Sequence, residues 1–231
     1  MRKLSIITPV YNERTHLKEV IERVRRAASS GLEKELILVD DGSDDGSGEL
    51  LESLKNHQTI IIHHPTNAGK GAAIRSGLSR ATGDIILIHD ADLELDPNDH
   101  PALIEPILKG EARIVYGTRY HGENGTFHYN TYYWGARMIS WLTNLLYGSD
   151  LTDVYCGYKA YAREILQSLH LTSNGFEIEQ ELTIKALKAR YPIAEVPVRY
   201  TPRRFEEGKK LRWKDGLSAL RLIIKHQLIS S

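Results

Sequence analysis

The segment Asp84–Glu94 carries the residues best suited to chemistry, because an apolar, strand-forming run ends in Asp90, Asp92 and Glu94. Residues two apart on an extended backbone point to the same side, so the three carboxylates are expected to face one way. Carboxylate oxygens are ligands that Mg²⁺ or Mn²⁺ accepts when substrate phosphates complete the coordination. An acidic exit from a strand into a loop would give the same pattern, so other segments must decide.

The first half of the chain alternates short β-rich runs with amphipathic helical segments. Strands are predicted near Leu4–Thr8, Glu35–Val39, Thr59–His63, Asp84–His89 and Arg113–Tyr116. Helices are predicted near Thr15–Ala28, Gly46–Leu54, Gly69–Ala81 and Pro101–Leu108. This rhythm is typical of βαβ units, so we expect an α/β fold with a mostly parallel central sheet flanked by helices.

A polar motif follows each of the five predicted strands. In chain order the motifs are Pro9–Glu13, Asp40–Ser43, Asn67–Gly71, Asp90–Asp92 and Gly117–Tyr120. Each alone reads as an ordinary turn or helix start. Ligands bind at the carboxyl ends of parallel strands, however, and all five motifs fall there. The set therefore predicts one binding site along that edge of the sheet.

These motifs, together with Asp153-x-x-x-Gly157-Tyr158-Lys159 and Pro202-Arg203, resemble the family 2 glycosyltransferases of GT-A fold. The similarity is closest to the branch of polyprenyl-phosphate hexosyltransferases, such as the dolichyl-phosphate mannosyltransferases. It implies metal-dependent, inverting transfer of a hexose from a nucleotide sugar of the GDP-mannose or UDP-glucose type. The implied acceptor is a polyprenyl or dolichyl phosphate at the cytoplasmic membrane face.

The resemblance also assigns roles to residues that lie on the motifs. Those expected to bind substrate are Pro9, Tyr11, Glu13, Val39, Asp41, Lys70, Asp90, Ala91 and Arg203. Asp92 matches the metal ligand, and Glu94 stands where the mannosyltransferases usually have glutamine. Since glutamate also coordinates through oxygen, a Mg²⁺ or Mn²⁺ site is still expected, but the preference for sugar and nucleotide stays open. The metal would take up charge that develops on the leaving diphosphate.

Two arginines are candidates for the acceptor phosphate, because a guanidinium group matches phosphate oxygens with two parallel hydrogen bonds. Arg119 directly follows the fifth predicted strand. Arg137 lies in the segment Tyr132–Leu142, where it could instead be a surface charge on an amphipathic helix. We count Asp92, Arg119 and Arg137 as the catalytic candidates.

The nature of the acceptor decides whether a catalytic base is needed. A phosphate monoester is mostly dianionic at pH 7, so it can attack without losing a proton. A sugar hydroxyl would require a base, for which Asp153, Glu177 and Glu179 are the acids in suitable context. Two other functions therefore stay open: transfer to a carbohydrate hydroxyl in polysaccharide or glycolipid synthesis, and non-catalytic binding of a nucleotide sugar.

Composition sets the remaining expectations. The 231 residues have a net charge of +0, which gives no sign of nucleic-acid binding, and one cysteine, which fits a reducing cytoplasm. We expect a catalytic domain over residues 1–200, with a nucleotide-sugar-binding half (1–120) and an acceptor half (121–200). Residues 201–231 should form a basic loop and an amphipathic helix. That helix and Tyr132–Leu146 suit a membrane surface, although packing on the domain or on a dimer partner would explain them too; the oligomeric state is left open.

Overall fold

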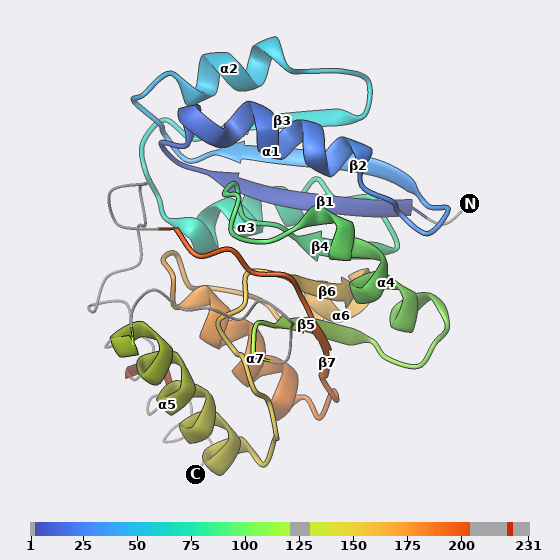
Figure 1. Ribbon diagram of the computed structural model, residues 1–231, viewed down its shortest axis with the longest axis vertical. Helices are drawn as coiled ribbons and strands as arrows, with labels where there is room; N and C mark the ends of the chain where they lie inside the picture. Colours follow the sequence, from blue (N-terminus) through green and yellow to red (C-terminus); the bar gives the residue numbers. More distant parts are fainter. Residues whose placement is uncertain (1–2, 121–129, 204–220, 224–231) are drawn as a thin grey trace.

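The computed structural model describes residues 3–120, 130–203 and 221–223, with only the backbone of 130–132, and these form a seven-stranded sheet between layers of helices (Figure 1). The strands are β1 (Lys3–Val10), β2 (Glu33–Asp40), β3 (Thr59–His63), β4 (Ile85–Ile88), β5 (Ile114–Thr118), β6 (Lys159–Ala162) and β7 (Ala194–Pro197). The helices are α1 (Arg14–Arg26), α2 (Ser47–Ser53), α3 (Lys70–Leu78), α4 (His100–Leu108), α5 (Asn130–Tyr147), α6 (Arg163–Ser168) and α7 (Ile178–Lys188), with a 3₁₀ turn η1 (Pro97–Asp99).

The strand order is β3-β2-β1-β4-β6-β5-β7. β1 pairs in parallel with β2 and β4, β2 with β3, and β5 with β7, whereas β6 runs antiparallel to both β4 and β5. The predicted α/β fold with a mostly parallel sheet is therefore confirmed, with one reversed strand in it. Since β6 runs against β4, the residues just before it lie at the same sheet edge as the residues just after β4.

All five predicted strands and all four predicted helices are present. One expectation about their detail is wrong. β4 ends at Ile88, so Asp90, Asp92 and Glu94 lie on the loop after the strand and not on an extended backbone. Their side chains therefore do not share one direction through strand alternation, and the structure separates Asp90 from the other two acids.

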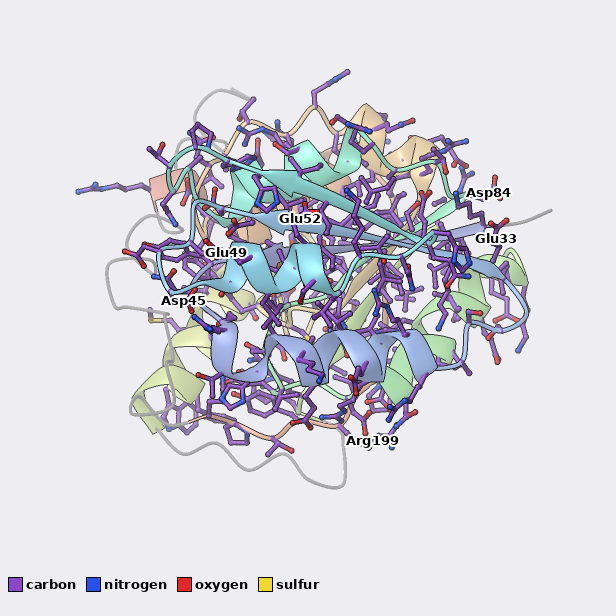
Figure 2. All side chains as sticks on the ribbon, turned by 90° about the horizontal axis from the view of Figure 1, so that it is seen from above. Glu33, Asp45, Glu49, Glu52, Asp84 and Arg199 are labelled. Carbon is purple, nitrogen blue, oxygen red and sulfur yellow. The ribbon has the colours of Figure 1, made fainter. Side chains whose placement is uncertain are left out.

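Apolar side chains alternate along the strands and fill two cores, one on each face of the sheet. In β2, Leu36 and Leu38 face the core shared with α1, α2 and α4. Ile37 and Val39 face the core shared with α3, α6 and α7. Both faces are thus covered by helices, which leaves the two edges of the sheet, where the strands begin and end, to carry polar groups. Figure 2 labels Glu33 and Asp84 at the amino end of the strands and Asp45 at the opposite end.

α5 lies apart from these two cores and packs on α7 through a small third cluster that contains Ile139, Ile184 and Ile223. It corresponds to the amphipathic segment predicted near Tyr132–Leu146. The second predicted amphipathic helix falls, apart from 221–223, outside the described residues. Within the part of the chain that is described, no helix is long and apolar enough to cross a membrane.

Candidate active site

The loops after β1 and β2 are fastened to each other at the carboxyl edge of the sheet. The Asn12 side chain donates to Asp44 Oδ1 over 2.8 Å, and the Asn12 backbone N–H donates to Ser43 Oγ over 3.0 Å. The backbone N–H of Glu13 donates to Ser47 Oγ, which lies at the first residue of α2. Pro9, near the end of β1, and Tyr11, on the loop after it, are half-buried. The Glu13 carboxylate accepts from Arg203, which also donates to Asp92 after β4.

Arg203 lies at the centre of an acidic cluster that consists of Asp92 and Glu94, after β4, and Glu13, after β1. Its Nη1 lies 3.0 Å from Glu13 Oε2, its Nη2 lies 3.0 Å from Asp92 Oδ2, and its Nε lies 3.9 Å from Glu94 Oε1. The backbone N–H of Arg203 also donates to Glu94 Oε1 over 2.9 Å. The chain after β7 thus runs back along the sheet to meet the loop after β1 (Figure 1).

Burial makes these charges depend on one another. Burial raises the pKa of Asp92, and the neighbouring Glu94 carboxylate raises it further. Burial alone would lower the pKa of Arg203, but the Asp92 and Glu13 carboxylates raise it overall. Removing one partner from such a group leaves the other charge poorly solvated, so the acids need a cation close by.

Asp92 and Glu94 fit the metal role predicted for them in one respect: their oxygens already converge on a positive charge. Among the described residues, no group of three or more His, Cys, Asp or Glu side chains is arranged to hold a metal ion. Oxygen donors with substrate phosphates as partners nevertheless match the needs of Mg²⁺ and Mn²⁺. Asp92 and Glu94 would hold the ion, and Glu13 is the third carboxylate at this place.

Asp90 belongs to a different set of charges, which reaches deep into the fold. Its Oδ1 lies 2.6 Å from Lys70 Nζ, and the same nitrogen lies 2.7 Å from Glu179 Oε1. Glu179 Oε2 accepts a hydrogen bond from Lys159, a residue of β6 that is 0% exposed. Lys159 Nζ also donates to the backbone oxygen of Cys156 over 2.7 Å. Lys70, predicted to bind donor phosphate, is thus held between two acids on the side of the site next to α3.

This chain of charges fixes protonation states. Burial would lower the pKa of Lys70, but Asp90 and Glu179 raise it overall. Burial would raise the pKa of Glu179, but Lys159 and Lys70 hold it below its ordinary value. Glu179 is therefore an ionised counter-charge and a weak proton acceptor.

Gly157 lets Asp90 lie close to the strand that returns as β6. A Cβ atom at position 157 would collide with the Asp90 carboxylate, so only glycine fits there without a shift. The neighbouring Ala91 is buried with a 4% exposed fraction. The segment Asp153–Lys159, singled out in the sequence, therefore shapes the floor of the site directly behind Asp90.

Arg119 directly follows β5 and forms a two-pronged pair with Asp153. Its Nε lies 2.7 Å from Asp153 Oδ2, and its Nη2 lies 2.8 Å from Asp153 Oδ1. The guanidinium carbon lies 5.1 Å from the centre of the Tyr200 ring. Although burial opposes it, the Asp153 carboxylate raises the pKa of Arg119 overall.

Arg137 lies on the exposed side of α5 and reaches back towards the same end of β5. Its guanidinium carbon lies 5.0 Å from the centre of the Tyr120 ring, and Tyr120 in turn packs edge-on against Tyr133. Arg137 thus contacts Tyr120, the residue next to Arg119, so both arginines predicted to bind the acceptor phosphate lie near the same end of β5.

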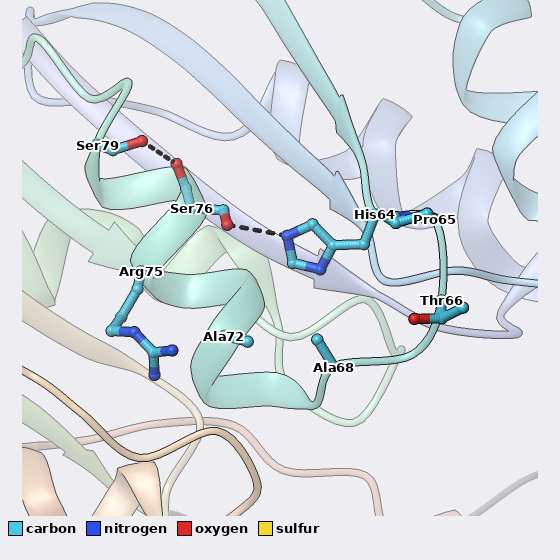
Figure 3. A pocket seen from close by; sticks show the side chains of 8 residues that line it. All are labelled: His64, Pro65, Thr66, Ala68, Ala72, Arg75, Ser76 and Ser79. Carbon is cyan, nitrogen blue, oxygen red and sulfur yellow. Dashed lines mark hydrogen bonds between the residues drawn. The ribbon is translucent and has the colours of Figure 1, made fainter.

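Asp41 and Val39 are placed inside the protein. The Val39 side chain is 0% exposed and belongs to the core over α3. Asp41 accepts hydrogen bonds from His64 Nδ1 over 2.6 Å and from the backbone N–H of Gly69 over 2.7 Å. His64 continues the chain through Nε2 to Ser76 Oγ at 2.8 Å, as Figure 3 shows for that second bond. Asp41 therefore holds the β3–α3 loop, and its expected role in binding substrate stays a prediction.

A pocket of about 500 Å³ opens between the β3–α3 loop and α3 (Figure 3). Its lining residues are His64, Pro65, Thr66, Ala68, Ala72, Arg75, Ser76 and Ser79. Arg75, one of these residues, donates a hydrogen bond from Nη2 to Asn174 Oδ1 over 2.6 Å. The acids of the β4 loop are not among the lining residues, so this pocket is separate from the acidic cluster.

Sequence reasoning missed the roles of Lys159 and Tyr200. Lys159 lies in the buried strand Lys159–Ala162, and a lysine in such a strand needs an acidic partner. That requirement was a usable signal for Glu179. Tyr200 carried no comparable signal. Burial raises the pKa of Cys156 to about 12 and lowers the pKa of His89 to about 3.

A mixed sheet with helices on both faces and polar loops at its carboxyl edge is the architecture expected for a GT-A type fold. A model of glycosyl transferase family 2 matches residues 5–169, and the chain belongs to this family. A dolichol-phosphate mannosyltransferase of Pyrococcus furiosus is 32% identical over 228 residues, which cover 96% of this chain and 63% of that protein. The chain thus spans less than two thirds of the length of this relative.

Solved structures agree on the fold. Glucosyl-3-phosphoglycerate synthase from Mycobacterium tuberculosis, in complex with Mn²⁺, UDP and phosphoglyceric acid, superposes with a TM-score of 0.75 at 22% identity, covering 98% of this chain and 78% of that one. The same enzyme with phosphoglyceric acid alone gives a TM-score of 0.74 at 23% identity, covering 97% and 80%. At such identities the likeness concerns the fold.

Proposed function

We propose that the protein is a metal-dependent glycosyltransferase that moves a hexose from a nucleotide sugar onto a polyprenyl-type lipid phosphate at the cytoplasmic membrane face. Residues 1–120 would bind the donor, and residues 121–200 would bind the acceptor. Asp92 and Glu94 would hold Mg²⁺ or Mn²⁺, which neutralises charge on the leaving diphosphate. Arg119 and Arg137 would bind the acceptor phosphate.

The observation that carries this proposal is the state of the acids that could have served as a base. Glu179 is held between Lys70 and Lys159, and Asp153 is held by Arg119. A carboxylate whose charge is stabilised by a neighbouring cation binds protons weakly. Lys159 and Lys70 hold the pKa of Glu179 below its ordinary value, so Glu179 is a poor base, while both Asp153 oxygens already accept hydrogen bonds from Arg119. An acceptor that is already ionised, such as a phosphate, needs no base.

A second support comes from α5, which presents a stripe of large apolar side chains to solvent. Trp134, Met138, Trp141 and Leu145 have exposed fractions of 67%, 55%, 62% and 64%. The helix contains no Asp or Glu, and its single charge, Arg137, is exposed. Aromatic and apolar residues beside a cation suit the interface of an anionic membrane. This stripe would bring the acceptor arginines to the depth of a lipid phosphate.

The relative from Pyrococcus furiosus is named for transfer to dolichol phosphate, and it is similar over nearly the whole of this chain. That similarity favours the lipid acceptor over a carbohydrate hydroxyl, which stays the second candidate. If the hydroxyl is used, Glu177 is the remaining candidate base. It is half-buried, and its Oε1 accepts from the backbone N–H of Gly175 over 3.0 Å.

A donor and acceptor panel tests the proposal. GDP-mannose, UDP-glucose and UDP-GlcNAc would each be assayed with a polyprenyl phosphate, the matching unphosphorylated polyprenol and a simple sugar, with Mg²⁺, Mn²⁺ or EDTA. We expect one donor to react with the polyprenyl phosphate and with neither hydroxyl acceptor, and only with metal present. Transfer to a sugar hydroxyl with no reaction of the lipid phosphate would replace the proposal by the second candidate.

A further inference from the structure

We propose that Arg203 is a built-in counter-ion that holds the metal-binding acids together and gives way when a divalent cation binds. This inference rests on the metal dependence proposed above. It adds a device that the resemblance does not supply, namely a residue of the chain that occupies the place of the cation and competes with it. Arg203 would therefore set how tightly the protein binds metal before any donor is present.

The guanidinium group of Arg203 lies among acidic side chains. Three carboxylates, from the loops after β1 and β4, surround one positive charge, and two of the contacts are 3.0 Å long. The Arg203 side chain is only 11% exposed. Acids from separate loops would repel one another without this charge, so Arg203 keeps them at one place.

Arg203 and a divalent cation need the same oxygen atoms. Asp92 Oδ2 accepts from Nη2, and Glu94 Oε1 accepts from the backbone N–H of Arg203. A hard cation takes carboxylate oxygens as direct ligands, which uses the lone pairs that now face Arg203. Two cations side by side also repel each other in a buried site. The metal-bound and arginine-bound states therefore exclude each other.

The contacts of the residues just before Arg203 would stay in place when its side chain moves away. The backbone N–H of Thr201 donates to the backbone oxygen of Glu94 over 2.8 Å, and Tyr200 forms a bridge with Leu95. These bonds do not involve the carboxylates. The chain would stay attached at Tyr200 and Thr201, while the Arg203 side chain would move away and become available to bind substrate, the role predicted for it from sequence.

Binding of Mn²⁺ and Mg²⁺ to the whole protein without nucleotide or acceptor tests the proposal. The variants are Arg203→Gln and, as a matched control, Arg199→Gln, which removes an arginine paired with Asp96 and Asp99 outside the site. By titration calorimetry, Arg203→Gln should bind Mn²⁺ about tenfold tighter or more than wild type, because the competing charge-assisted bonds are gone. Arg199→Gln should match wild type.

Two further readouts separate competition from a general gain in negative charge. In EDTA, Arg203→Gln should melt at a lower temperature than wild type, and saturating Mn²⁺ should raise its melting temperature by more than it does for wild type. In ¹⁵N-labelled wild type, the Nε–Hε signal of Arg203, identified by its loss in Arg203→Gln, should shift on addition of diamagnetic Mg²⁺. An unshifted signal at saturating Mg²⁺ would show that Arg203 stays in place and would overturn the proposal.

The remaining outcomes are equally decisive. If wild type and Arg203→Gln bind Mn²⁺ with equal affinity, the competition is refuted while metal dependence of the enzyme survives. If neither protein binds Mn²⁺ or Mg²⁺ without nucleotide, the competition fails, while metal dependence is judged separately by the EDTA arm of the transfer assay. Because no sugar transfer is measured, a failure in the acceptor assignment cannot imitate either result.

Discussion

Carboxylates lie at both edges of the central sheet, buried at the amino edge and half-buried at the carboxyl edge, and they are neutralised by different means. At the amino edge, Glu35 accepts hydrogen bonds from the backbone N–H of Thr82 over 2.6 Å and from Thr82 Oγ1 over 2.8 Å, with Lys3 Nζ at 2.5 Å. At the carboxyl edge, Asp92 and Glu94 depend on Arg203, which arrives from 111 and 109 residues further along the chain.

The difference appears in the pKa values. Burial alone would raise the pKa of Glu35, but Lys3, Ser5 and Thr82 together lower it from 4.5 to about 2. The pKa of Asp92 is raised instead, because burial and Glu94 outweigh its favourable partners. A carboxylate that accepts several hydrogen bonds from fixed donors around it stabilises the fold, whereas a carboxylate with few such donors is suited to bind a cation. We infer that the amino edge contributes stability and the carboxyl edge contributes chemistry.

The change expected to have the largest effect is Asp92→Asn. It removes a charge of the proposed metal site with almost no change in size, so kcat/KM for sugar transfer should fall by about 10³-fold or more. The free energy of unfolding without metal should be unchanged or slightly higher, because the raised pKa of Asp92 means that its charged form opposes folding at neutral pH. Steady-state kinetics and urea unfolding check the two parts. Transfer at close to the wild-type rate, with the same metal requirement, would contradict the assignment of chemistry to the carboxyl edge.

Glu35→Gln is the converse change at the amino edge. A carboxylate whose pKa falls from 4.5 to about 2 on folding stabilises the folded state by about 3 kcal/mol at neutral pH. The variant should lose stability of that order in urea unfolding and keep its kcat. Because the folded-state pKa is the lower one, the advantage of wild type is complete above pH 4.5 and should disappear as the pH falls through about 2. A stability difference that does not change with pH would refute the assignment.

Arg119→Ala and Arg137→Ala sharpen the comparison within the carboxyl edge. Charge-assisted hydrogen bonds to phosphate contribute about 1.5–3 kcal/mol each, so each change should weaken acceptor use by about tenfold or more. Arg119→Ala should also lower stability, since it leaves the buried Asp153 without its partner, whereas the exposed Arg137 should not. Acceptor kinetics, thermal unfolding and calorimetry with nucleotide alone measure these effects. An equal loss of nucleotide binding would reassign the two arginines to the donor.

Glu177→Gln is expected to have the smallest effect. With an ionised phosphate as acceptor, no side chain has to remove a proton, so the variant should retain most of its kcat at neutral pH. Glu179→Gln is a less clean test, because it would leave Lys70 and Lys159 without a shared counter-charge and act through stability. A fall in kcat of about 10²-fold for Glu177→Gln, with normal donor and metal binding, would favour a hydroxyl acceptor.

Much of the fold was predictable because its signals are local. Apolar runs and amphipathic periods placed five strands and four helices, and the segment Thr59–His63 coincides with β3. β6 and β7 were not predicted, since each has four residues and neither is bounded by the βαβ rhythm of the first half. The reversed direction of β6 follows from its pairing with β4 and β5, which no local pattern records.

The candidate site divides in the same way. The strand-end motifs were predicted to converge, and hydrogen bonds between the loops after β1 and β2 agree with this. The partners of the charges were not predictable, because Arg203 meets Glu13 across 190 residues and Lys159 meets Glu179 across a strand and a helix. Local sequence fixes which residues stand at an edge, but the choice among several cations for each acid depends on tertiary packing.

The separation of 111 residues between Asp92 and Arg203 also has a consequence for the newly made chain. At a synthesis rate of about 5–20 residues per second, β1 to β4 would emerge roughly 5–20 s before Arg203 does. During that interval the acids after β4 would lack their arginine, and dissolved Mg²⁺ would be the cation at hand. We expect nascent chains stalled before Arg203 to resist proteolysis better in Mg²⁺ than in EDTA, an advantage that should shrink once Arg203 has emerged. The ion proposed to assist sugar transfer would then serve earlier as a temporary folding aid.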